Sequence, residues 1–158
     1  MDPPQPWSPE RAQAIIAAHQ SLEGPLIPIL HALQNSFGLV PREAVPLIAR
    51  ALNLSRAEVH GVVTFYHDFR DRLPGGRVVK LCRAEACQAK GGEAAARVLL
   101  SVLGLPYTDG WGGTTADGAV TVEPVYCLGL CAVAPAALID GEPCGRLDGM
   151  RLCEAAGS

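Results

Sequence analysis

Two pairs of closely spaced cysteines constrain the fold of this chain more than any other feature of its sequence. Cys82 and Cys87 are separated by four residues, Cys127 and Cys131 by three, and 39 residues lie between the pairs. Thiols from two such distant segments meet only where the fold brings two loops together. The matched pairs therefore predict one site with four thiolate ligands rather than four unrelated side chains.

The loops that contain these cysteines favour an iron–sulfur cluster. Each pair follows a segment predicted as a strand, and small residues surround it, among them Ala84, Ala86, Gly129 and Ala132. Small side chains let backbone N–H groups come close to a bound group. A 2Fe-2S cluster with four thiolates is a dianion when oxidised, and amide donors and partial exclusion of water stabilise it. The spacing suits such a cluster, with two thiolates for each iron.

Zinc is the main alternative, because it also accepts four cysteines, although its structural sites more often contain Cys-x-x-Cys. Cysteines buried as small hydrophobic residues are a second alternative, which explains single thiols better than matched pairs. A thioredoxin-type dithiol needs Cys-x-x-Cys, which the sequence lacks. A Rieske centre needs two histidine ligands, and all four histidines precede Cys82 in the helical half.

The remaining chemistry-bearing residues do not form a catalytic site. Cys144 and Cys153 complete the six cysteines, and we expect Cys144 to be a buried small residue and Cys153 a thiol of the tail, neither of them a ligand. The sequence has no dinucleotide-binding glycine motif, phosphate-binding loop, nucleophile elbow or His-Glu-x-x-His. No catalytic residue is predicted, and a one-electron centre without a substrate pocket is expected to pass electrons between other redox centres.

Hydrophobic periodicity predicts a helical bundle over residues 1–73. Helices are expected from Ser8 or Pro9 to Leu22, from Leu26 to Phe37, after Pro41 as far as Asn53, and from a Ser55–Glu58 capping box to about Phe69. The aromatic residues Phe65, Tyr66 and Phe69 either complete this core or partly face a partner.

The pattern changes after a Leu-Pro-Gly-Gly segment at 73–76, which marks a domain boundary. A β-branched run predicts a strand at 77–82, followed by a helix near 93–103, a strand at 119–126 and a hairpin of 136–140 with 144–147. We therefore predict a mixed α/β (α+β) chain, with an N-terminal helical bundle at 1–73 and a compact α/β domain at 74–158.

Composition limits the partners and the location. Of the 158 residues 49% are hydrophobic, which supports a folded core, and the net charge of −3 gives no cationic surface for nucleic acid. Residues 1–11 lack the basic start and apolar stretch of a secretory signal. The uncharged run 124–139 is too short for a membrane span. We expect a cytoplasmic protein that neither binds nucleic acid nor inserts into a membrane.

Motifs spread over nearly the whole chain point to one protein family. They are Phe37-Gly38 before a helix that starts with proline, the run HGVVTFY at 60–66, Cys-x4-Cys, CLGLC at 127–131 and Ala134-Pro135. On these residues the chain resembles the thioredoxin-like 2Fe-2S subunits of respiratory complex I and of soluble NAD-linked formate dehydrogenases and hydrogenases. CRAEACQ at 82–88 and YCLGLC at 126–131 look most like the gamma subunit of NAD-dependent, molybdenum- or tungsten-containing formate dehydrogenase.

The resemblance implies that residues 74–158 form a thioredoxin-like 2Fe-2S domain holding one cluster per chain. Its ligands would be Cys82, Cys87, Cys127 and Cys131. The implied function is that of a non-catalytic electron-transfer subunit in a cytoplasmic NAD-dependent formate dehydrogenase. Its implied partners are a flavin- and NAD-binding subunit and a molybdenum- or tungsten-containing catalytic subunit. The alternatives are the equivalent subunit of NADH:quinone oxidoreductase (complex I) or of an NAD-linked hydrogenase and, more remotely, a zinc-stabilised assembly module without redox function.

Overall fold

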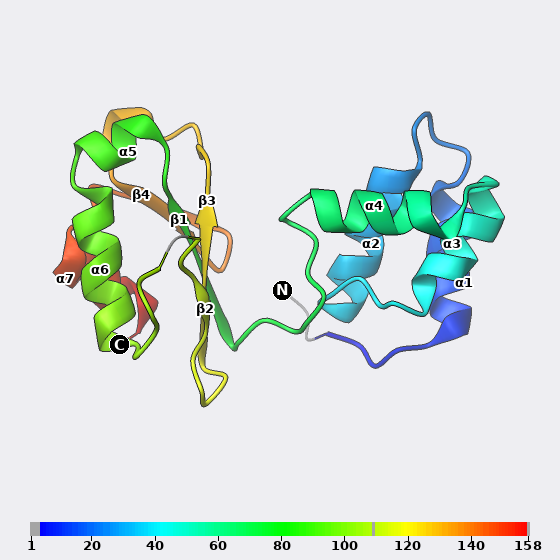
Figure 1. The fold of residues 1–158 in the computed structure, drawn as a ribbon, viewed down its shortest axis with the longest axis horizontal. Helices are drawn as coiled ribbons and strands as arrows, with labels where there is room; N and C mark the ends of the chain where they lie inside the picture. The colour runs from blue at the N-terminus through cyan, green and yellow to red at the C-terminus, as the bar shows by residue number, and fades with distance from the viewer. Residues whose placement is uncertain (1–3, 109, 158) are drawn as a thin grey trace. The chain divides into compact units, whose positions relative to one another are not determined.

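The chain divides into two compact units, Met1–Leu73 and Pro74–Ser158, in a computed structural model that describes residues 4–108 and 110–157. Within the described residues the first unit is helical, and the second combines helices with a five-stranded sheet (Figure 1). This confirms the predicted mixed α/β class. None of the helices in these two stretches is long and apolar enough to cross a lipid bilayer.

The first unit consists of helices whose apolar faces share one core. They are α1 (Pro9–His19), α2 (Leu26–Phe37), α3 (Ala44–Leu52) and α4 (Arg56–Phe65). The apolar stripe of α2 contributes Ile29, Leu30 and Leu33, all fully buried. The predicted helical bundle is therefore present, although α1 ends at His19, before the predicted Leu22.

Local signals in the sequence set the helix ends of this unit. Ser55 Oγ accepts a hydrogen bond from the Glu58 N–H at 3.1 Å, and a carboxylate oxygen of Glu58 accepts one from the Ser55 N–H at 2.8 Å, which is the predicted capping box. Asn53, with φ of 53°, ends α3 in the left-handed conformation. The last helix ends at Phe65, so Phe69 lies outside it.

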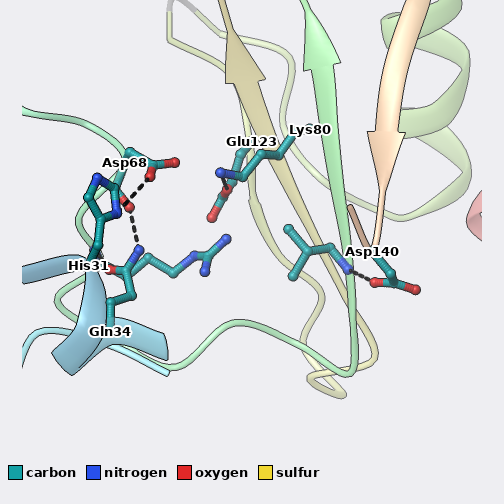
Figure 2. Close-up of polar contacts among 8 residues, drawn as sticks. His31, Gln34, Asp68, Lys80, Glu123 and Asp140 are labelled. Atoms are coloured by element: carbon teal, nitrogen blue, oxygen red, sulfur yellow. Dashed lines mark hydrogen bonds and ion pairs between the residues drawn. The ribbon is translucent and has the colours of Figure 1, made fainter. Parts of the chain in front are cut away.

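A buried glutamine that no sequence pattern predicted links the segment after α4 to α2. The Gln34 amide donates to the Asp68 carbonyl at 2.7 Å, and its Oε1 accepts from the Arg70 N–H at 2.7 Å (Figure 2). Gln34 is 8% exposed. A side chain that satisfies two backbone groups from a buried position stabilises this turn.

The second unit is built on a mixed sheet with strand order β2-β3-β1-β4-β5. The strands are β1 (Arg77–Cys82), β2 (Gly113–Thr114), β3 (Val120–Val125), β4 (Ala136–Ile139) and β5 (Glu142–Gly145). The central strand β1 runs parallel to β3 and antiparallel to β4. The predicted strands and hairpin are present, while the two-residue β2 in the glycine-rich segment was not predicted.

Two helices pack against the same side of this sheet, α6 (Gly92–Val102) and α7 (Gly149–Ala156). Their core joins Val79 and Leu81 of β1 to Leu99 of α6 and Leu152 of α7. Helix α6 was predicted, whereas α7, the short helix α5 (Glu85–Ala89) and the 3-10 helix η1 (Cys131–Val133) were not. The last two lie in the cysteine loops and are too short to show a period.

Candidate metal centre

Parallel pairing of β1 with β3 brings the two cysteine loops together. Cys82, the last residue of β1, is in register with Val125, the last residue of β3. The Arg83 N–H continues this pairing by donating to the Val125 carbonyl at 2.7 Å. The loop that contains Cys127 therefore begins beside Cys82.

The four predicted sulfurs interact in two pairs. Burial, and then hydrogen bonding with the Cys82 sulfur, raise the pKa of Cys87, which lies on α5. Hydrogen bonding with the Cys127 sulfur, and to a smaller extent the charge of Cys82, raise the pKa of Cys131 at the start of η1. The structure thus places the four candidate ligands within electrostatic reach of one another.

Two kinds of metal centre use four cysteine ligands and arrange them differently. Over residues 4–108 and 110–157, no three His, Cys, Asp or Glu side chains are grouped to hold one metal ion. Tetrahedral zinc needs its four ligands around one point. A 2Fe-2S cluster also has four cysteine ligands but divides them between two irons. The paired arrangement suits the second requirement.

Backbone amides surround the sulfurs, as expected for an anionic cluster. Burial alone would raise the pKa of Cys82, but hydrogen bonds from the Ala84 N–H, the Cys87 thiol and the amides of the 127–128 loop outweigh it, and the net shift is downward. The Gly129 N–H donates to the Cys127 sulfur at 3.4 Å. These amides stabilise thiolate charge, so the donor set fits a 2Fe-2S cluster.

The conformation of the second cysteine loop explains why its amides face inward. Cys127 has φ of 82° and Gly129 has φ of 75°. Two left-handed residues in one short loop turn successive N–H groups to the same side. A left-handed conformation at a non-glycine residue costs about 1–3 kcal/mol and is concentrated at functional sites.

The two cysteine pairs differ in their contact with solvent. Cys82 and Cys87 are 4% and 2% exposed, whereas Cys127 and Cys131 are exposed. The surrounding residues are apolar and include Ala84, Val125, Leu128, Leu130, Ala134 and Ala136. Burial raises the pKa of Cys87, and its hydrogen bond to Cys82 raises it further. One side of the site is therefore shielded from water and the other faces it.

The two remaining cysteines lie elsewhere in the second unit. Cys144, on β5, and Cys153, on α7, are both partly buried and pack against the sheet–helix core. Burial raises the pKa of Cys153. Its expected place in a tail is wrong: Asp148 caps a helix there by accepting a hydrogen bond from the Arg151 N–H, and Cys153 lies within that helix.

Comparison with known proteins identifies the family of this chain. Residues 12–156 match the family model described as thioredoxin-like [2Fe-2S] ferredoxin. An NADH-quinone oxidoreductase subunit from Pseudomonas aeruginosa is 37% identical over 132 residues, which cover 82% of this chain and 77% of the relative. The HndA subunit of an NADP-reducing hydrogenase from Solidesulfovibrio fructosivorans is 31% identical over 144 residues, which cover 91% of this chain and 81% of that relative.

A solved structure shares the fold. The crystal structure of an NAD+-reducing [NiFe]-hydrogenase in its H2-reduced state superposes with a TM-score of 0.68 at 26% identity. The match covers 84% of this chain and 21% of the hydrogenase chain, so this chain spans about a fifth of that protein's length. The chain therefore belongs to the thioredoxin-like [2Fe-2S] ferredoxin family, which confirms the predicted fold and the predicted 2Fe-2S cofactor.

Proposed function

We propose that this chain is an electron-transfer subunit of an NAD-linked oxidoreductase complex. The observation that carries the proposal is the convergence of four cysteine sulfurs as two pairs among inward-facing amides. A 2Fe-2S cluster, when bound, accepts and donates single electrons. Its proposed ligands are Cys82, Cys87, Cys127 and Cys131.

Each part of the site has a separate role in this proposal. The thiolates bind the irons, and the amides of the 127–129 loop offset negative charge on the sulfurs. The buried pair, Cys82 and Cys87, keeps water from one side. The exposed pair, Cys127 and Cys131, marks the side on which a redox partner approaches.

The parent complex is proposed from the relatives and from the motifs. The two relatives are subunits of an NADH-quinone oxidoreductase and of an NADP-reducing hydrogenase. This supports a partner subunit that binds flavin and NAD(P). The formate dehydrogenase gamma subunit, with its molybdenum- or tungsten-containing partner, stays a prediction that rests on residues 82–88 and 126–131. The complex I or hydrogenase alternative fits the relatives at least as well. We further propose a cytoplasmic location, and that the two compact units are separate domains.

The cofactor assignment is tested by preparing the full chain anaerobically with iron and sulfide. We expect about two irons and two acid-labile sulfides per chain, and an electron paramagnetic resonance signal only after reduction. Stoichiometric zinc without sulfide would overturn the proposal and support the assembly module.

The parent complex is tested by purifying the native assembly through a tag on this chain and assaying it with formate, hydrogen and NADH. Reduction of NAD+ by formate would establish the formate dehydrogenase assignment. Activity with hydrogen, or with NADH and a quinone, would establish the corresponding alternative. Absence of any redox subunit from the assembly would overturn the proposed function.

Two aromatic residues at the end of α4 form the surface that we propose contacts the flavin subunit. Phe65 is 73% exposed and Tyr66 is 48% exposed. Phe69 is 8% exposed and belongs to the helical core, so the expectation that it partly faces a partner is wrong. We expect Phe65→Asp to lower the yield of co-purified flavin subunit, and Leu22→Asp, at a residue 47% exposed in the same unit, to leave it unchanged. Undiminished yield with Phe65→Asp would exclude this surface.

A further inference from the structure

Arg83 connects the two cysteine loops through its backbone. Its N–H donates to the carbonyl of Val125, at the end of β3, over 2.7 Å. Its carbonyl accepts a hydrogen bond from the side-chain amide of Gln88, the residue after Cys87, also over 2.7 Å. Arg83, adjacent in sequence to Cys82, therefore stabilises the loop that contains Cys87. It also links that loop to β3, the strand that leads to the loop with Cys127.

The Arg83 side chain forms an ion pair in a partly enclosed setting. Its Nε lies 3.0 Å from Oε1 of Glu93, near the start of α6, and the Tyr107 hydroxyl donates to the other carboxylate oxygen. The guanidinium lies 5.6 Å from the ring centroid of Trp111. The side chains of Arg83 and Glu93 are 23% and 28% exposed. Water therefore screens these charges less than charges on the open surface.

Both partners are ionised at neutral pH. Hydrogen bonding from Tyr107, and then the ion pair with Arg83, hold the pKa of Glu93 below its ordinary value, and arginine stays protonated. A nearby positive charge favours the addition of an electron to the site, and a nearby negative charge opposes it. In the Arg83–Glu93 pair, the opposite effects of the two charges on the reduction potential offset each other.

We propose that Arg83 and Glu93 are positioning residues that set the reduction potential of the cluster. Arg83 holds the two cysteine loops in register, and Glu93 orients its guanidinium and offsets the positive charge. This inference rests on the proposed function, because it takes the four cysteines as the ligands. The pair is not apparent from the sequence, because ten positions and an intervening helix separate the two residues.

The test is a redox titration of the full chain with its cluster, in which electron paramagnetic resonance monitors the reduced form. We expect Arg83→Gln to lower the potential and Glu93→Gln to raise it. Each change is on the order of tenfold in the one-electron equilibrium constant, which is about 59 mV. The double variant should return towards the wild-type potential, and Arg83→Lys, which keeps the charge, should lie closer to wild type than Arg83→Gln.

Opposite shifts distinguish this role from a structural one, because loss of a structural contact would lower the free energy of unfolding in both variants alike. Arg151→Gln and Glu154→Gln are matched controls. They make the same charge changes at exposed positions of α7, and we expect them to change the equilibrium less than about twofold.

Potentials that shift in the same direction in the two single variants, or shift no more than in the controls, would overturn the inference. If Arg83→Gln fails to assemble the cluster, the nearly isosteric Glu93→Gln decides, and an unchanged potential there overturns the proposal. A wild-type chain without iron and sulfide would instead refute the proposed function, so the two failures are distinct.

Discussion

The backbone N–H of Gly129 donates a hydrogen bond to the sulfur of Cys127 across 3.4 Å. Such N–H···S bonds stabilise negative charge on the sulfur, and hydrogen bonds to the sulfurs are among the factors that set the potentials of iron–sulfur proteins. Gly129 itself has a left-handed φ of 75°, which turns the chain from this contact towards Cys131. No neighbouring atom lies within 4 Å of the position that a Cβ would take.

We therefore predict that Gly129→Ala lowers the reduction potential. The added methyl group meets no neighbour, but it disfavours the left-handed backbone by about 1–2 kcal/mol and so weakens the N–H···S bond. Redox titration measures the change. Gly141→Ala is the matched control, because Gly141 has φ of 90° and equally open surroundings in the β4–β5 turn. A shift of the same size in both variants would contradict the prediction.

Substitution of individual cysteines should distinguish the cluster ligands from the cysteines that do not bind the cluster. We expect Cys82→Ser and Cys131→Ser, one from each pair, to lose or remodel the cluster, because serine replaces a soft thiolate with a hydroxyl. Cys153→Ser should keep the wild-type visible spectrum and iron content, since Cys153 packs against the core through α7. Loss of the cluster in Cys153→Ser alone would show that the ligand assignment is wrong.

Stability should depend on pH through Glu93. Its pKa in the folded chain is below the ordinary 4.5, because the Tyr107 hydroxyl and then Arg83 stabilise the carboxylate. The unfolded chain therefore binds more protons between the folded pKa and 4.5, so the stabilisation is fully present above 4.5 and is lost as pH falls through the folded pKa.

We predict that wild type exceeds Glu93→Gln in free energy of unfolding by about 1 kcal/mol near neutral pH, and that the difference shrinks in acid. Urea denaturation of both proteins from about pH 6 to about pH 3.5 measures it, and losses common to both cancel. A difference that stays constant across this range would contradict the sign derived above.

The helical unit should depend on Gln34. Gln34→Met removes both hydrogen bonds to the 68–70 segment while keeping the volume, and we expect a loss of about 2 kcal/mol. Trp7, whose ring centroid lies 5.3 Å from that of Phe37, reports on this unit when Trp111→Phe removes the other tryptophan. Gln13→Met, at an exposed position of α1, is the control. An equal loss in the control would show that the buried contacts are not responsible.

Local and periodic signals predicted much of this structure. The β-branched run of β1, the apolar stripe of α2 and the Ser55 capping box each act within a few residues, so the sequence alone reveals them. The cysteine spacing likewise predicted two pairs from two loops.

Features that depend on tertiary contacts were not predicted. Gln34 binds a segment more than thirty positions away, and Arg83 meets Glu93 only after α5 has turned the chain back. The inward-facing amides depend on the positive φ of Cys127, and a cysteine in the sequence does not indicate a positive φ. Phe69 has the same aromatic character as Phe65, and only the path of the chain after α4 buries one and exposes the other.

The parallel pairing of β1 with β3 also fixes when a metal can arrive. Parallel neighbours need a crossover, here the segment with α5 and α6, so their pairing joins residues far apart in the sequence. Until that pairing has formed, Cys82 and Cys127 belong to separate stretches of chain. Iron delivered to a nascent polypeptide would find only two of the four proposed ligands together, so we expect cofactor insertion to follow closure of the sheet.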